Sequence, residues 1–404
     1  MQQLTGQQRL KPWMGFVLFA VLMAVVRFVC FPMQTAWGIS GFIATELVFL
    51  VIASSYAFIF RIPVKEMFPV KKFSAKDLFG SLFLCSGGVM FGLISIYLVG
   101  LIFPKSLEGR DVQALNDYIG GSNGYILTVF VLSVLPAVCE EAVHRGAILS
   151  NFRTIKKDWV IMILMAVFFG AFHLSVLRFI NTAILGACLT YIVVKKNNLL
   201  LSSLAHFIIN FVSVLISYFS SAQVTGGNSQ TVRMSGEVIK AGLGLYLMIG
   251  MAAPFLIVTG LMLLDSQSHK KIRFLFAGIV SAVMLACSVF ITVSVSFGSK
   301  DIVKTNMSYT VDYENSESLP LCFTIENEGD YTLAVVVMNS SGNYSVRMEK
   351  SNGDVVLNGM LSSGGIKKYS QRIALEPGDY RLIFVNGNGT AGGKPVISVQ
   401  IISD

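Results

Sequence analysis

Residues 123–149, NGYILTVFVLSVLPAVCEEAVHRGAIL, form an apolar run long enough to cross a lipid bilayer as one helix. Near the end of the run stand four ionisable side chains, Glu140, Glu141, His144 and Arg145. Ionisable groups inside a spanning helix are costly and usually serve a function. The stretch therefore predicts a membrane helix that carries part of a functional site.

The whole chain has the composition of a membrane protein. Of its 404 residues, 54% are hydrophobic and 13% are charged, whereas a soluble domain carries about 25% charged residues. We expect an all-α bundle of about 8–9 spans, in which the fifth and sixth segments form a tight hairpin or a partly re-entrant pair. The apolar segments lie near 14–32, 37–60, 79–103, 123–149, 159–174, 177–194, 198–219, 237–264 and 273–297.

Lys and Arg concentrate in alternate loops between these segments. The rich loops are 61–78, 150–158, 195–197 and 265–272. Since such loops face the cytoplasm, the pattern predicts a multi-pass plasma-membrane protein with a cytoplasmic N-terminus. An odd number of spans then places residues 300–404 outside the cytoplasm, and an even number would place them inside. The net charge of +8 thus indicates orientation and not nucleic-acid binding.

Residues 300–404 are expected to form a second domain, separate from the helical domain at 1–299. The segments LPLCFTIE, DYTLAVVVM, NYSVRMEK, KKYSQRIAL, GDYRLIFV and KPVISVQII alternate with turn-forming stretches rich in Gly, Asn and Ser. Short strands at this spacing predict an antiparallel β-sandwich. The segment LEPGDYRLIF resembles the closing strand of small bacterial jelly-roll domains, which implies that the tail binds an extracytoplasmic partner.

Two further apolar segments carry polar residues, namely His173 in FFGAFHLS and His206 with Asn210 in LAHFIINF. Helix geometry lets Glu141 pair with Arg145, places His206 and Asn210 on one face, and turns Glu140 about 100° away from Glu141. Counted from the cytoplasmic ends at 1.5 Å per residue, Glu140, His173 and His206 lie roughly 15, 21 and 12 Å deep. These depths allow the three groups to meet in one cavity.

The chemistry of this set indicates peptide hydrolysis. A carboxylate beside a histidine can activate water as a general base. A second histidine and an amide can donate hydrogen bonds to the developing oxyanion. Glu140, His173 and His206 could instead hold Zn²⁺ or another divalent metal, and the sequence leaves that alternative open. For Glu141 and Arg145 alone, a structural ion pair is the simpler interpretation.

Three short motifs carry a family resemblance. EEAVHR (140–145) fits EExxxR, FGAFH (169–173) fits FxxxH, and HFIIN (206–210) fits HxxxN, in this order and within apolar helices. Over about residues 79–220 the chain resembles the CAAX-protease and bacteriocin-processing (CPBP, or Abi) membrane proteases, which include the Ras-converting CAAX endopeptidases.

The resemblance implies a role for each matching residue. Glu140 would activate water with His173 as its partner, and His206 with Asn210 would form the oxyanion hole. Glu141 and Arg145 would support the first motif. The resemblance further implies a site that opens towards the cytoplasm and a peptide or membrane-protein substrate, prenylated in some relatives. Because some members are described as metalloproteases and others as metal-free, it leaves metal dependence open.

Two other classes of function fit parts of the sequence. A non-enzymatic bacteriocin-immunity or membrane scaffold protein would use the tail to bind an exported partner. A proton-coupled transporter would use buried Glu and His as a relay, but the chain shows no inverted repeat of broken helices.

Overall fold

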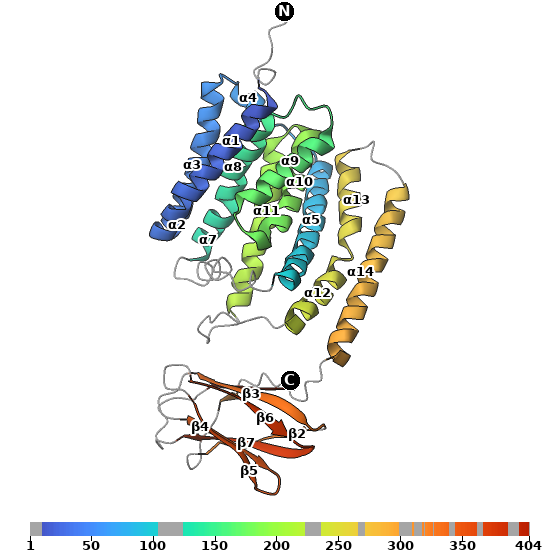
Figure 1. Cartoon of the computed structure of the whole chain (residues 1–404). Helices are drawn as coiled ribbons and strands as arrows, with labels where there is room; N and C mark the ends of the chain where they lie inside the picture. Colours follow the sequence, from blue (N-terminus) through green and yellow to red (C-terminus); the bar gives the residue numbers. More distant parts are fainter. Residues whose placement is uncertain are drawn as a thin grey trace, which may run out of the picture. The chain divides into compact units, whose positions relative to one another are not determined.

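The computed structural model divides into two compact units, Met1–Val295 and Ser296–Asp404 (Figure 1). Each unit has its own hydrophobic core, and each is described by itself below. The structure describes residues 10–103, 124–222, 236–265, 271–298, 309–310, 317–318, 320–325, 327–338, 344–361, 367–386 and 396–403.

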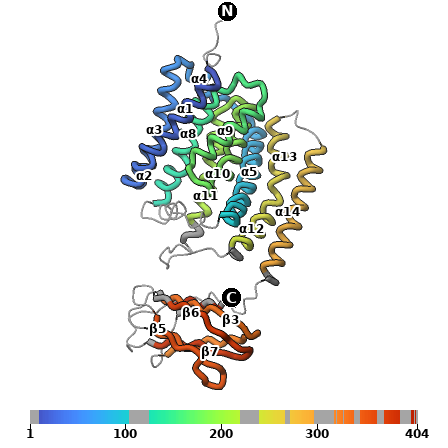
Figure 2. Tube along the Cα trace, viewed as in Figure 1, coloured from blue at the N-terminus to red at the C-terminus, as the bar shows by residue number. Residues whose placement is uncertain are grey.

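The first unit is a bundle of apolar helices, traced in Figure 2. Eight helical runs among the described residues are long and apolar enough to cross a membrane, which confirms the predicted multi-pass bundle. They are α1 with η2 and α2 (Pro12–Val25, Val26–Cys30, Phe31–Trp37), α3 (Ile39–Ile59), α5 (Ala75–Ile102), α7 to η5 (Tyr125–Ile148), α10 (Val176–Lys196), α11 (Leu199–Ala222), α12 with α13 (Gly236–Gly250, Ala253–Leu264) and α14 (Lys271–Gly298). A short helix α4 spans Val64–Met67.

The fifth apolar segment is the shorter helix α9 (Asp158–Phe172). It packs against α10 and is joined to it by a connection in which Leu174 has a φ of 50°. A left-handed residue just past a helix end stops the helix and reverses the chain. The fifth and sixth segments therefore form the expected tight hairpin.

Prolines follow two of the π-helical stretches in the long runs. The π-helical stretches η2 and η4 (Phe130–Val134) end shortly before Pro32 and Pro136. A proline has no N–H to donate, so the hydrogen-bond register shifts around it. Pro254 is the second residue of α13, and the segment expected as one helix over 237–264 is interrupted after Gly250.

Packing brings the polar segments together. The run from α7 to η5 consists of α7 (Tyr125–Val129), η4, α8 (Leu135–Glu141) and η5 (Ala142–Ile148). It contacts α3 and α11, while α10 packs against both α9 and α5. In Figure 1, α5 stands between the helices that carry the polar residues and the later helices α12 and α13, both of which it contacts.

The basic loops meet at one end of the bundle. Lys195 Nζ lies 2.9 Å from Asp158 and 3.6 Å from Asp265, and Lys196 Nζ lies 2.6 Å from Asp77. These contacts link the ends of α5, α9, α10 and α13. The loops predicted to share the cytoplasmic side thus share one end, while the side of the membrane that this end faces stays a prediction.

The described residues of the second unit form two four-stranded antiparallel sheets, ordered β1-β8-β3-β6 and β2-β7-β4-β5. Both sheets contribute to one hydrophobic core, including Leu333, Val346, Leu382 and Val399, as the sandwich prediction requires. The strands are β1 (Tyr309–Thr310), β2 (Leu321–Ile325), β3 (Gly329–Met338), β4 (Tyr344–Lys350), β5 (Val355–Met360), β6 (Lys367–Leu375), β7 (Gly378–Asn386) and β8 (Val396–Ser403).

The sequence segments predicted six of these strands and missed β1 and β5. Strand β5 forms a hairpin with β4 around Gly353, whose φ of 92° suits glycine, and Lys350 N–H donates to Asp354 O in the turn. Its sequence, VVLNGM, ends in polar and small residues that resemble a loop. Pairing with β4 makes it a strand.

Candidate active site

The centre of the helical unit is a buried ion pair. Arg145 Nη1 donates to Glu141 Oε1 at 2.7 Å, and neither side chain is exposed. Glu141 ends α8 and Arg145 lies one turn later in the π-helical stretch η5, so the predicted pairing of these two residues is present. A buried pair of this kind needs further hydrogen bonds to offset the loss of hydration.

Arg145 receives those additional contacts from the α9–α10 hairpin. Its Nη2 donates to the carbonyl oxygen of Gly186 at 3.1 Å, and its guanidinium carbon lies 4.3 Å from the centre of the Phe169 ring. An arginine stacked on an aromatic face gains a cation–π interaction, which is stronger away from water. The hairpin is thereby tied to the helix that bears the glutamates.

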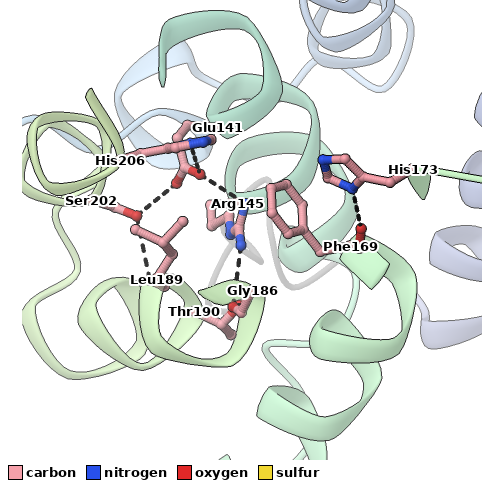
Figure 3. Close-up of polar contacts among 9 residues, drawn as sticks. All are labelled: Glu141, Arg145, Phe169, His173, Gly186, Leu189, Thr190, Ser202 and His206. Atoms are coloured by element: carbon pink, nitrogen blue, oxygen red, sulfur yellow. Dashed lines mark hydrogen bonds and ion pairs between the residues drawn. The ribbon is translucent and has the colours of Figure 1, made fainter. Parts of the chain in front are cut away.

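Glu141 is held equally firmly by α11. Ser202 Oγ donates to Glu141 Oε2 at 2.6 Å, and His206 Nδ1 lies 3.1 Å from Glu141 Oε1. Figure 3 shows the Glu141 carboxylate between the α11 side chains and Arg145. Two segments far apart in the sequence thus meet at one carboxylate, which makes it the organising group of the site.

These contacts decide how His206 can act. An ionised carboxylate only accepts hydrogen bonds, so Nδ1 of His206 carries the hydrogen. In the neutral ring, Nε2 is then an acceptor, and it becomes a donor only when the ring is protonated.

His173 is fixed in a similar way at the end of α9. Its Nδ1 lies 2.8 Å from the carbonyl oxygen of Phe169, so Nδ1 donates and Nε2 keeps a lone pair. The Phe169 ring stands between Arg145 and His173 (Figure 3), with its centre 5.1 Å from that of the His173 ring. Both sequence-predicted histidines therefore have Nδ1 anchored and Nε2 available.

Glu140 lies beside this assembly and is 8% exposed. Among the described residues, the ion pairs of this segment are made by its neighbour Glu141. The Glu140 carboxylate interacts electrostatically with His206, Arg145 and Arg178. Glu140 is thus a nearly buried carboxylate within electrostatic range of these groups.

The remaining predicted residue and the metal alternative are less closely tied to this assembly. Asn210 is half-buried one turn after His206 on α11. Within the described part of the chain, no three His, Cys, Asp or Glu side chains are grouped as metal ligands. Glu140, His173 and His206 as arranged here therefore do not fit a zinc site, and no step of the proposed chemistry is routed through a metal.

Sequence reasoning missed three polar residues near the site. Ser202 has no place in the predicted site, although it lies four residues before His206 on the same apolar helix. His144 has no predicted role either, yet it is completely buried against Phe169 and Phe172. Glu46, in the second apolar segment, is 7% exposed. An acidic residue within an apolar helix was the signal that could have identified it.

Comparison with known proteins agrees with this geometry. The family model described as type II CAAX prenyl endopeptidase Rce1-like matches residues 122–212, less than half of the chain. Among curated proteins, none matches the chain significantly. The matched segment contains both residues of the buried ion pair and both anchored histidines. Residues 122–212 are thus a domain of the Rce1-like type II CAAX prenyl endopeptidase family, a family of membrane proteases.

Proposed function

We propose that this protein is an intramembrane endopeptidase that hydrolyses a peptide bond with water activated by Glu140 and His173. The observation that carries the proposal is the buried carboxylate of Glu141, the neighbour of Glu140 in the chain, which contacts Arg145, Ser202 and His206. A purely structural ion pair would not need to orient a histidine from a second helix. The family match to the same segment supports the same reaction class.

The proposed reaction uses no covalent intermediate. Glu140 takes a proton from water as the water oxygen attacks the carbonyl carbon of the substrate. His206 and Asn210 donate hydrogen bonds to the oxygen that becomes negative. The C–N bond then breaks as its nitrogen receives the proton held by Glu140, relayed through Nε2 of His173, and the products are a carboxylic acid, which keeps the second hydrogen of the water, and an amine.

The contacts of His206 place a condition on this mechanism. Since Nδ1 faces Glu141, the ring donates from Nε2 only as the imidazolium. The proposed function of Glu141 is to orient the His206 ring, and the proposed function of Arg145 is to hold Glu141. Glu141 and Arg145, the supporting residues of the EExxxR motif, would therefore act through His206.

The proposed substrates are peptides or membrane proteins whose cleavage site reaches the bilayer, with prenylated C-termini as one class. The proposed orientation has the basic loops and the N-terminus in the cytoplasm and the site open to that side. With the shorter helix α9 as a ninth crossing beside the eight longer runs, the number of spans is odd, and the β-sandwich would then lie outside the cytoplasm, where it would bind an exported partner.

A map of protein N-termini tests the activity without knowledge of the substrate. Membranes from cells making wild-type protein are compared with membranes from cells making Glu140→Gln at matched levels. We expect a set of new N-termini with the wild type that is absent with Glu140→Gln. Glu328→Gln, an exposed glutamate of the second unit, is the matched control and should leave the map unchanged.

Identical maps for wild type and Glu140→Gln would refute the proposal, provided that both proteins melt at the same temperature in detergent. A phenotype retained by Glu140→Gln would then favour the immunity or scaffold function.

A further inference from the structure

A second buried carboxyl group lies on the helix that faces Glu140. Glu46 belongs to α3, outside the segment matched by the family model. It is 7% exposed, and its Oε2 atom is fully buried with no hydrogen-bond partner among the described residues. Almost all buried polar atoms in native proteins are satisfied by protein groups or by ordered water. This oxygen therefore calls for a hydrogen-bond donor from a ligand.

The buried face of α3 points towards the site. Phe49 follows Glu46 by three residues, which places both on one face of the helix. The Phe49 ring packs against that of Phe172 at 5.1 Å, and Phe172 packs against His144 at 4.8 Å and His173 at 5.4 Å. Glu46 thus lies on the face of α3 that meets the histidines.

Glu46 and Glu140 also lie at the same depth. Tyr56 O–H donates to Asn151 Oδ1 at 2.7 Å, which fixes α3 against the chain just after η5. Glu46 precedes Tyr56, and Glu140 precedes Asn151, by about ten residues, so both lie roughly 15 Å from this bond at 1.5 Å per residue. The electrostatic interaction between the two carboxyl groups agrees with this placement.

His144 gives an independent indication of a polar ligand in this region. It is completely buried, and neither ring nitrogen has a hydrogen-bond partner among the described residues. Its ring edges meet Phe169 and Phe172, the same aromatic pair that flanks His173. Two elements, α3 and η5, thus place unpartnered polar atoms beside the proposed reaction centre.

We propose that Glu46 is a further residue of the proteolytic site and accepts the second O–H of the water that Glu140 activates. A water molecule has two hydrogens, and acceptors on two different helices would fix both of them. Its lone pair is then aimed at the substrate carbonyl, and this alignment lowers the entropic part of the barrier. Glu46 takes no proton, since the transferred proton passes to Glu140.

This inference rests on the proposed endopeptidase function, and its test separates the two. N-terminal maps and initial rates of product appearance are compared for wild type, Glu46→Leu, Glu46→Gln and Glu140→Gln. Leucine has a similar size but no acceptor, whereas glutamine keeps one acceptor oxygen. We expect Glu46→Leu to slow product appearance by roughly 10–100-fold, Glu46→Gln to restore most of the rate, and Glu140→Gln to abolish it.

Melting temperatures in detergent show whether each variant folds. Leucine in place of a buried carboxyl group is not expected to lower the melting temperature. A purely structural role of Glu46 would change stability and rate together, without recovery in Glu46→Gln. If Glu46→Leu matches the wild type while Glu140→Gln is inactive, the inference fails and the proposed function stands. If wild type and Glu140→Gln give the same map, both fail.

Discussion

Glu141 and Arg145, one helical turn apart, form an ion pair of 2.7 Å in which neither side chain is exposed. Removal of one partner from such a pair leaves an uncompensated charge in a medium of low dielectric constant. The pair also links α11 and the α9–α10 hairpin to the helix of the glutamates. Its disruption should therefore affect both stability and the proposed catalysis.

Arg145→Met should lower the free energy of unfolding by about 3–5 kcal/mol. The double variant Glu141→Gln/Arg145→Met should lose less than the sum of the two single variants, because no buried charge is left unpaired. Unfolding of the detergent-solubilised protein measures the free energy of unfolding of the single and double variants. Lys195→Met is the control, since the ion pairs of Lys195 with Asp158 and Asp265 are both partly exposed and should each contribute at most about 1 kcal/mol. Equal effects of Arg145→Met and Lys195→Met would contradict the expectation.

Ser202→Ala should slow proteolysis through His206. The hydroxyl donates to the carboxylate that also holds the His206 ring, so its loss allows that carboxylate to turn. We expect the initial rate of product appearance to fall about tenfold, which corresponds to about 1.4 kcal/mol, and Ser202→Thr to recover part of it. Ser213→Ala on the same helix, which loses only a bond to the Ile209 carbonyl, should retain the wild-type rate. A wild-type rate in Ser202→Ala would exclude this role.

Gly186→Ala should separate α10 from α9. A Cβ atom at residue 186 would stand 2.8 Å from Cβ of Phe169, the residue whose carbonyl anchors His173. Overpacking of this kind costs about 1–3 kcal/mol, and the displacement of His173 should reduce cleavage further. Unfolding and initial rates measure the two effects.

Gly278→Ala provides the control for this substitution. Gly278 lies in α14, and its nearest neighbour would be 4.0 Å from the new Cβ. Because alanine favours the helix, this variant should be as stable as the wild type or up to about 1 kcal/mol more stable. If Gly186→Ala and Gly278→Ala lose the same amount of stability and activity, the close contact between α9 and α10 is not the cause of the loss in Gly186→Ala.

The proposed orientation can be tested at a native cysteine. Cys322 is exposed in β2 of the second unit, so a membrane-impermeant maleimide should label it on intact cells if that unit lies outside. Labelling should disappear in Cys322→Ser, which excludes reaction at Cys287, the other exposed cysteine among the described residues. Labelling that requires cell lysis would place the second unit in the cytoplasm.

Local patterns in the sequence were enough to predict most of the architecture. Apolar length predicted the bundle, and alternation between apolar runs and turns predicted the sandwich. The spacing of Glu141 and Arg145 predicted their contact, because residues four apart on a helix are neighbours whatever surrounds them. Strand β5 escaped prediction because its pairing with β4, and not its composition, makes it a strand.

The contacts between helices were decided only by the tertiary structure. His206 and Asn210 share a helix face in the sequence, but which carboxylate that face meets depends on how α11 is rotated and packed. In the structure, His206 and Ser202 contact the carboxylate of Glu141 and not that of Glu140. Glu46 joins the site for the same reason, since the packing of α3 against α8 and η5 decides which of its faces is buried.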